Sequence, residues 1–142
     1  MRKILTVITI FMFFGCESEG ELTREKIGSG QVSSEATLRF MGIFEPEAGN
    51  KVTGTANIYK EGDHYKLSLK DFSISSGPDL KVYLSKTNRP DSFINLGSLG
   101  SGTSQTYTVP EGVSFATYPY VLIHCQQFNH LFATAALKSN SL

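Results

Sequence analysis

The sequence predicts an all-β protein, folded as an antiparallel β-sandwich of seven to eight short strands. Apolar and polar residues alternate with a period of two in several segments, and these segments are rich in β-branched side chains. Turn signals made of Gly, Pro, Asn, Asp and Ser recur at roughly ten-residue intervals. No segment combines a helical period with capping residues at both ends. The 142 residues are enough for one domain with a single core.

The strands are expected from residue 37 onward. In residues 52–59, small and apolar side chains alternate with polar or aromatic ones, and the alternation resumes at Tyr65. Residues 60–63 lie between them as a turn signal, so the two segments should pair as a hairpin. Residues 120–125 form the most apolar run beyond residue 14, which predicts a central strand covered on both faces. Further strands are expected at residues 80–84, 94–96, 107–109 and 131–137, with a turn at residues 127–130.

The N-terminus has the pattern of a secretory signal peptide. Two basic residues precede an apolar run, residues 4–14, which is shorter than the roughly 17–25 residues of a membrane-spanning helix. The run ends in Phe13-Phe14-Gly15-Cys16, which resembles the lipobox of bacterial lipoproteins, whose cysteine is lipidated and becomes the new N-terminus. An ordinary signal peptide with an incidental cysteine is the alternative. We therefore expect a signal peptide over residues 1–15, a lipidated Cys16 with a flexible tether over residues 16–36, and a folded domain over residues 37–142.

The residue after Cys16 bears on the location of the protein. In the best-known sorting rule an aspartate at this position retains a lipoprotein at the inner membrane, and here the residue is Glu17. We therefore expect a protein anchored to the bacterial outer membrane through its lipid. The periplasmic and external faces of that membrane both stay open.

Charge and cysteine content limit the possible partners. Thirteen basic residues balance thirteen acidic ones, and removal of residues 1–15 leaves eleven basic residues against thirteen. No Lys/Arg cluster indicates binding to nucleic acid or to an anionic lipid surface. With Cys16 lipidated, no intramolecular disulfide is possible, and Cys125 is the single free thiol of the mature chain.

Short motifs follow one another along the second half of the chain. They are Gly54-Thr55-Ala56, Leu69-Lys70-Asp71-Phe72, Gly77-Pro78-Asp79-Leu80-Lys81-Val82-Tyr83, Phe93-Ile94-Asn95-Leu96-Gly97, Tyr107-Thr108-Val109-Pro110 and Tyr120-Val121-Leu122-Ile123-His124-Cys125. Through them, residues 44–138 resemble the DM13 family. The resemblance implies a small all-β domain, related to the haem- and sugar-binding DOMON domains, that takes part in extracellular electron transfer around a signature cysteine. That cysteine corresponds to Cys125. The position before it is often aromatic in the family and is His124 here.

Two interpretations of Cys125 stay open. A thiolate can be oxidised to a sulfenic acid, form a mixed disulfide, or coordinate the iron of a haem. A free cysteine in an apolar strand can equally be an inert packing residue. His130 could fold back toward the strand end, where it would lower the pKa of the thiol when protonated or act as a second haem ligand, or it could be a solvated loop residue. His124 should point to the face opposite Cys125, because successive side chains of a strand alternate.

The other landmarks of the family resemblance are Asp71, Pro78 and Asp79, for which a turn role and a binding role are both open. No metal-ligand spacing, Ser-His-Asp arrangement or pair of carboxylates indicates an enzyme site. We therefore expect a cell-envelope lipoprotein that exchanges electrons with a partner redox protein through Cys125. The alternative is a non-catalytic module that binds an envelope protein or a glycan, with Cys125 as part of its core.

Overall fold

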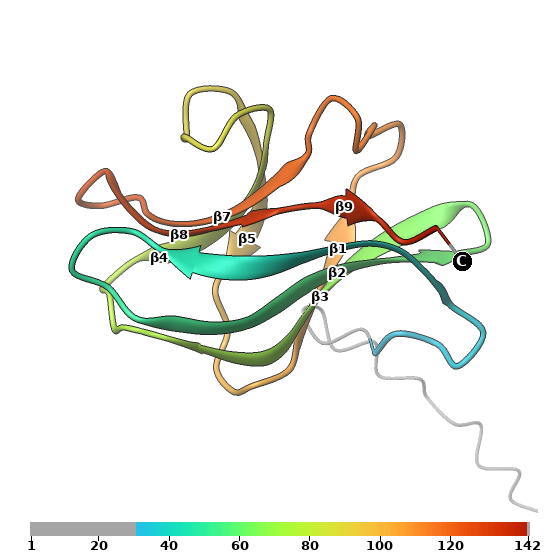
Figure 1. Ribbon diagram of the computed structural model, residues 1–142, viewed down its shortest axis with the longest axis horizontal. Helices are drawn as coiled ribbons and strands as arrows, with labels where there is room; N and C mark the ends of the chain where they lie inside the picture. The colour runs from blue at the N-terminus through green and yellow to red at the C-terminus, as the bar shows by residue number, and fades with distance from the viewer. Residues whose placement is uncertain (1–30, 142) are drawn as a thin grey trace, which may run out of the picture.

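The computed structural model describes residues 31–141, which form an all-β domain (Figure 1). Its strands are β1 (Thr37–Pro46), β2 (Val52–Glu61), β3 (His64–Ile74), β4 (Leu80–Ser85), β5 (Phe93–Ser98), β6 (Gln105–Val109), β7 (Tyr120–Cys125), β8 (His130–Ala136) and β9 (Lys138–Ser139). No helix long and apolar enough to cross a membrane occurs in residues 31–141. The expected signal peptide and Cys16 lie outside the described residues.

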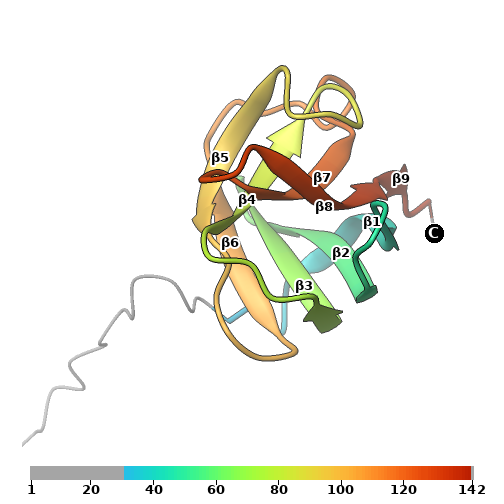
Figure 2. The same cartoon turned by 90° about the vertical axis from the view of Figure 1, so that its left-hand side faces the viewer.

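All strand pairs are antiparallel, and they belong to one continuous sheet in the order β5-β4-β7-β8-β1-β2-β3-β6, with β9 added to β1. The all-β antiparallel class predicted from the sequence is confirmed. The detail differs slightly from a sandwich, because the two leaves are not separate sheets. β1 pairs with β2 from Thr37 to Ile43 and with β8 from Phe44 to Pro46, so the sheet wraps into a nearly closed, barrel-like shape (Figure 2).

The wrapping depends on a close approach between β1 and the end of β8. A Cβ atom at Gly42 would lie 2.6 Å from the carbonyl oxygen of Ala136, closer than such atoms come to each other. A side chain at this position would therefore push the two strands apart. Beyond Ala136 the chain turns away, so that the N–H of Leu137 donates to the carbonyl of Pro119 (2.8 Å), and then rejoins β1 as β9.

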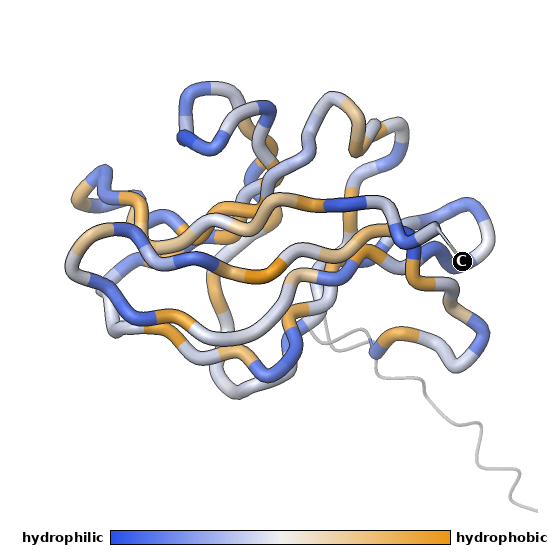
Figure 3. Tube along the Cα trace, in the orientation of Figure 1, coloured by the Kyte–Doolittle hydropathy of each residue, from blue (hydrophilic) through white to orange (hydrophobic). Residues whose placement is uncertain are grey.

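The core fills the space between the two leaves, and apolar residues alternate along most strands (Figure 3). In β2, Ala56 and Ile58 are fully buried, as the alternation predicts, but the polar Asn57 between them is also buried at 4% exposed. The central strand β7 is buried on both faces, since Ile123 faces the core and Leu122, on the opposite face, is also completely buried. The sequence-based expectation of a central strand over residues 120–125 is thus confirmed.

β5 and β6 are the two ends of the sheet, and side chains link them across the gap. The Tyr107 hydroxyl accepts a hydrogen bond from the N–H of Gly100 (3.1 Å) and lies 2.7 Å from Oε1 of Gln105 and 3.3 Å from the carbonyl oxygen of Ser98. Burial raises the pKa of Tyr107, and the Gly100 hydrogen bond partly opposes that rise. The neutral hydroxyl therefore acts as the junction at which the barrel closes.

Tyr107→Phe should lower the free energy of unfolding by about 1–2 kcal/mol, because it removes the hydrogen bonds of a half-buried hydroxyl, at roughly 0.5–1.5 kcal/mol each. The measurement is the denaturant midpoint of the purified protein. Tyr59→Phe is the matched control, since the Tyr59 hydroxyl accepts only a bond from the exposed Lys70 ammonium and its loss should cost less than about 1 kcal/mol. Equal losses in the two variants would contradict a closing role for Tyr107.

Candidate functional site

Cys125 is the last residue of the central strand β7. It pairs with Leu80 of β4 on one side and with His130 of β8 on the other. Its exposed fraction is 0%, and it belongs to the apolar core. The thiol is therefore positioned by backbone ladders on both sides, one residue below an exposed hairpin turn formed by residues 126–129.

Two apolar side chains and a glycine close the barrel near the thiol. Phe132 is almost fully buried, and Leu80 is half-buried and packs against the core. A Cβ at Gly77 would lie 2.7 Å from Cδ2 of Leu80 and 3.0 Å from Cζ of Phe132. Glycine at this position therefore lets the loop between β3 and β4 rest directly on these two side chains. We call Leu80 and Phe132 the apolar cap.

The Gly77-Pro78-Asp79 loop is also tied to the hairpin after Cys125. The N–H of Gln126 donates to the carbonyl of Asp79 (3.0 Å), while the Asp79 carboxylate pairs with the Lys81 ammonium (3.0 Å). Pro78 is exposed. Pro78 and Asp79 thus lie beside Cys125 in space, and Asp79 contacts its hairpin through the backbone.

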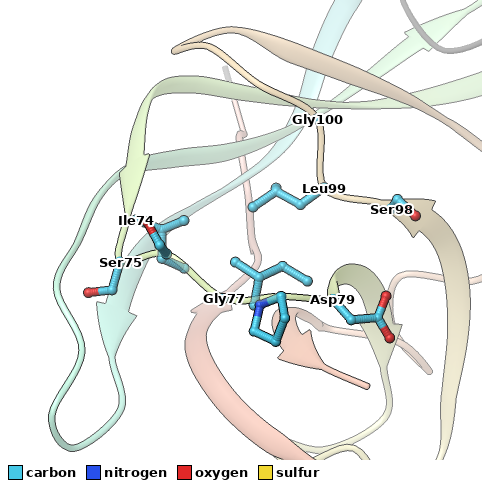
Figure 4. Close-up of a pocket in the computed structure, with 10 residues that line it drawn as sticks. Ile74, Ser75, Gly77, Asp79, Ser98, Leu99 and Gly100 are labelled. Carbon is cyan, nitrogen blue, oxygen red and sulfur yellow. The ribbon is translucent and has the colours of Figure 1, made fainter. Parts of the chain in front are cut away.

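An open pocket of about 350 Å³ lies between this loop and the turn after β5 (Figure 4). Its walls come from two segments, residues 74–80 and 98–100. Leu80 belongs both to this pocket and to the apolar cap. Leu80 is therefore the residue that connects the lining of the pocket with the strand position paired with Cys125.

His130 is the cross-strand neighbour of Cys125 on β8. Directly paired residues point to the same face of a sheet, with Cβ atoms about 4.5–5.5 Å apart. The His130 ring is exposed, lies 5.3 Å from the Phe132 ring, and has its Nε2 atom 3.4 Å from Nδ2 of Asn50. No hydrogen bond joins the His130 ring to the thiol in the described residues, so only the strand pairing brings the two residues together.

His124 lies on the opposite face of β7 and is only 5% exposed. Its Nε2 atom lies 3.2 Å from Oδ1 of Asn129, a residue in the left-handed conformation (φ 47°), and its ring centroid lies 5.4 Å from that of the buried Tyr83. Because an amide oxygen only accepts, this bond makes Nε2 the donor, and the buried Nδ1 has no hydrogen-bond partner among the described residues. Burial lowers the pKa of His124; the Asn129 hydrogen bond opposes this and the nearby His130 adds to it.

The structure thus brings Cys125, His130, Pro78 and Asp79 to one end of the barrel. Asp71 lies elsewhere, on β3 in the other leaf, with an exposed side chain and a left-handed backbone (φ 51°). Its carbonyl accepts from the Thr53 hydroxyl at a bulge opposite Gly54. Cys16 lies outside the described residues. Sequence reasoning missed the apolar cap, because Gly77 and Phe132 are far apart in the chain.

Haem does not fit this site. Cys125 is enclosed in the core and lines neither the pocket described above nor a second one beside β1. His130 comes from the position paired directly with Cys125, and two adjacent parallel side chains leave no room for a porphyrin between them. His124 projects from the other face of the strand.

Fold and site together define a small all-β domain with one thiol buried at the end of its central strand. The chain belongs to the DM13 family, described as electron transfer DM13, which matches residues 43–137. No curated protein and no solved structure matches the chain.

The lowered pKa of His124 predicts a pH dependence of stability. As the pH falls through about 6.5, the unfolded chain takes up a proton that the folded protein still refuses, so stability should fall with a slope of at most about 1.4 kcal/mol per pH unit. The groups around the ring are Lys81 and Tyr83 on β4 and His130 on β8. His124→Phe should remove this slope in denaturant titrations between about pH 7.5 and pH 5. An unchanged slope would show that another group causes it.

Proposed function

We propose that this protein is an electron-transfer domain that works through thiol–disulfide chemistry at Cys125, on a lipid anchor in the bacterial cell envelope. The observation that carries the proposal is the pairing of Cys125 with His130 at the end of the central strand, directly below an exposed turn. Membership of an electron-transfer family supports a redox role for the domain. A partner of the thiol or disulfide class in the envelope supplies or accepts the electrons.

The chemistry is a nucleophilic exchange. The Cys125 thiol gives its proton to the imidazole of His130 and its sulfur attacks a disulfide of the partner. One sulfur–sulfur bond forms to Cys125, the partner's sulfur–sulfur bond breaks, and the leaving sulfur departs as a thiolate. Cys125 is thereby oxidised to a mixed disulfide and the partner sulfur is reduced.

This exchange requires the thiol to be uncovered, since its exposed fraction is 0%. The surrounding elements are weakly held in two places. The hairpin over residues 126–129 is attached by the Gln126–Asp79 and His124–Asn129 hydrogen bonds, and the apolar cap consists of side chains only. Local opening at either place needs less free energy than global unfolding.

The described part of the chain begins at the other end of the barrel from Cys125. The first described residues lie beside the β2–β3 hairpin, where the Lys66 ammonium donates to the carbonyl of Gln31 and the N–H of Ser33 donates to Glu61. Figure 1 has this hairpin on the right and the turn over residues 126–129 on the left. A lipid at Cys16 would thus leave the thiol free to meet a partner away from the anchored end.

Oxidation of Cys125 tests the redox proposal. The full chain in detergent, treated with hydrogen peroxide and then with dimedone, should gain one dimedone adduct at Cys125 under native conditions, detected by mass spectrometry. His130→Gln should slow the adduct by at least about tenfold through loss of the base. Cys125→Ser is the blank, and an adduct that forms only in denaturant would contradict the proposal.

The second candidate function is a binding module with Cys125 as inert core. Complete burial of the thiol among apolar residues favours it, as do Met41 and Ile43, which are exposed on the outer face of β1. An envelope protein or a glycan would be its ligand. The peroxide experiment separates the two functions, because an inert core thiol reacts only after unfolding.

Lipidation has its own test. Cys16→Ala should abolish incorporation of a labelled fatty acid into the protein in a bacterial host and release it from the membrane fraction. Cys125→Ser is the matched control and should keep both the label and the membrane association. Persistent labelling of the Cys16 variant would rule out this anchor.

A further inference from the structure

We propose that the pocket between residues 74–80 and 98–100 binds a low-molecular-weight disulfide and that Leu80 is the gate through which it reaches Cys125. This inference rests on the proposed thiol chemistry and adds to it the route and the class of reactant. It makes Leu80 a positioning residue rather than a catalytic one, because its side chain takes no part in bond making.

Leu80 belongs both to the strand pair that contains Cys125 and to the lining of the pocket. On β4 it is the residue paired with Cys125, and it also lines the pocket. Both side chains belong to the inner face of the sheet, Cys125 within the core and Leu80 packed against it. Cβ atoms of such a pair are about 4.5–5.5 Å apart, so displacement of one leucine side chain connects the pocket with the sulfur.

Hydrogen bonds hold the backbone around Leu80 in place, whereas only packing holds its side chain. The carbonyl of Leu80 accepts from the N–H of Leu99 (2.8 Å), and the ladder to β7 holds the strand itself. The atoms that meet Gly77 are the far ends of the Leu80 and Phe132 side chains. Opening by a change of rotamer therefore leaves every backbone hydrogen bond in place, whereas opening at the hairpin breaks the Gln126–Asp79 bond.

The volume, lining and charge of the pocket limit the class of reactant that it can bind. Its volume of about 350 Å³ is at the lower end of the range for small-molecule sites and excludes a folded protein domain. Ile74, Leu80 and Leu99 contribute apolar side chains, while polar groups make up most of the exposed lining. The Asp79 carboxylate is paired with Lys81, so no unpaired charge selects an ion. A small uncharged disulfide matches these walls.

The reaction balances within the site. The Cys125 sulfur, having given its proton to His130 or to water, forms a bond to one sulfur of the bound disulfide. The other sulfur leaves as a thiolate, takes up a proton and departs through the pocket. Cys125 ends as a mixed disulfide with one half of the small disulfide, and the sulfur of the other half has been reduced to a thiol.

The test measures the rate at which 4,4′-dithiodipyridine, a small uncharged disulfide, reacts with the full chain in detergent. Leu80→Ala should raise this rate at least tenfold over the wild-type protein. Leu67→Ala is the matched control, because it removes the same atoms from a fully buried position on β3, which is not paired with β7. If general loosening exposed the thiol, the Leu67 variant would react at least as fast as the Leu80 variant.

Two further measurements test the gate. Leu80→Met, which keeps the volume of the gate, should react at a rate close to that of the wild type. For each reagent, the rate on the folded protein is divided by the rate on the unfolded chain. This ratio should be far smaller for a maleimide that carries a large polyethylene glycol than for 4,4′-dithiodipyridine.

The outcomes separate this inference from the proposed function. Equal rates for Leu80→Ala and Leu67→Ala, with a thiol that reacts in the native protein, would overturn the gate and leave the redox role intact. A thiol that reacts only at the rate of global unfolding, in the wild type and in both variants, would overturn both.

Discussion

One strand holds the two leaves of this barrel together, and the site depends on it. β1 pairs with β2 through its first seven residues and with β8 through its last three, so both of its edges are used. Gly42 allows the close approach that this requires. The wrapping then brings the connection after β1 against the start of β8, where Asn50 contacts His130, and lays the Gly77 loop over the apolar cap. A flat sheet with the same strands would leave Cys125 without a cover.

Burial of the thiol restricts how anything can reach it. Separating β7 from a neighbouring strand would break several ladder hydrogen bonds, each worth about 0.5–1.5 kcal/mol net, and would expose core at about 25 cal/mol per Å². A change of the Leu80 rotamer breaks no backbone hydrogen bond, and its cost is limited to the packing of that one side chain. Motion of side chains in the apolar cap is therefore the least expensive way to uncover Cys125, and the fold supplies a pocket on the outer side of that cap.

Much of the fold could be predicted from local pattern, and the parts that could not depend on contacts between distant residues. Alternation located the core-facing Ala56 and Ile58 of β2 but not the buried Asn57, and the apolar run over residues 120–125 identified the central strand. Alternation also placed His124 on the face opposite Cys125. It did not reveal what covers that face, since Asn129 and Tyr83 do so through a left-handed turn and a neighbouring strand. The meeting of Gly77 with Phe132 has no local signal either.

His124 is buried against Tyr83, and its contacts show both what the ring gains at this position and what its burial costs. The ring lies against Tyr83 as an aromatic side chain would, and it gains one hydrogen bond to Asn129. The buried Nδ1 atom, however, has no partner among the described residues, which costs about 1–3 kcal/mol, against a gain of about 1 kcal/mol from the bond that is made. Histidine therefore stabilises the hairpin less than an aromatic residue would. The hairpin that carries this cost directly follows Cys125, so its local opening needs less free energy than that of a hairpin with every polar group paired.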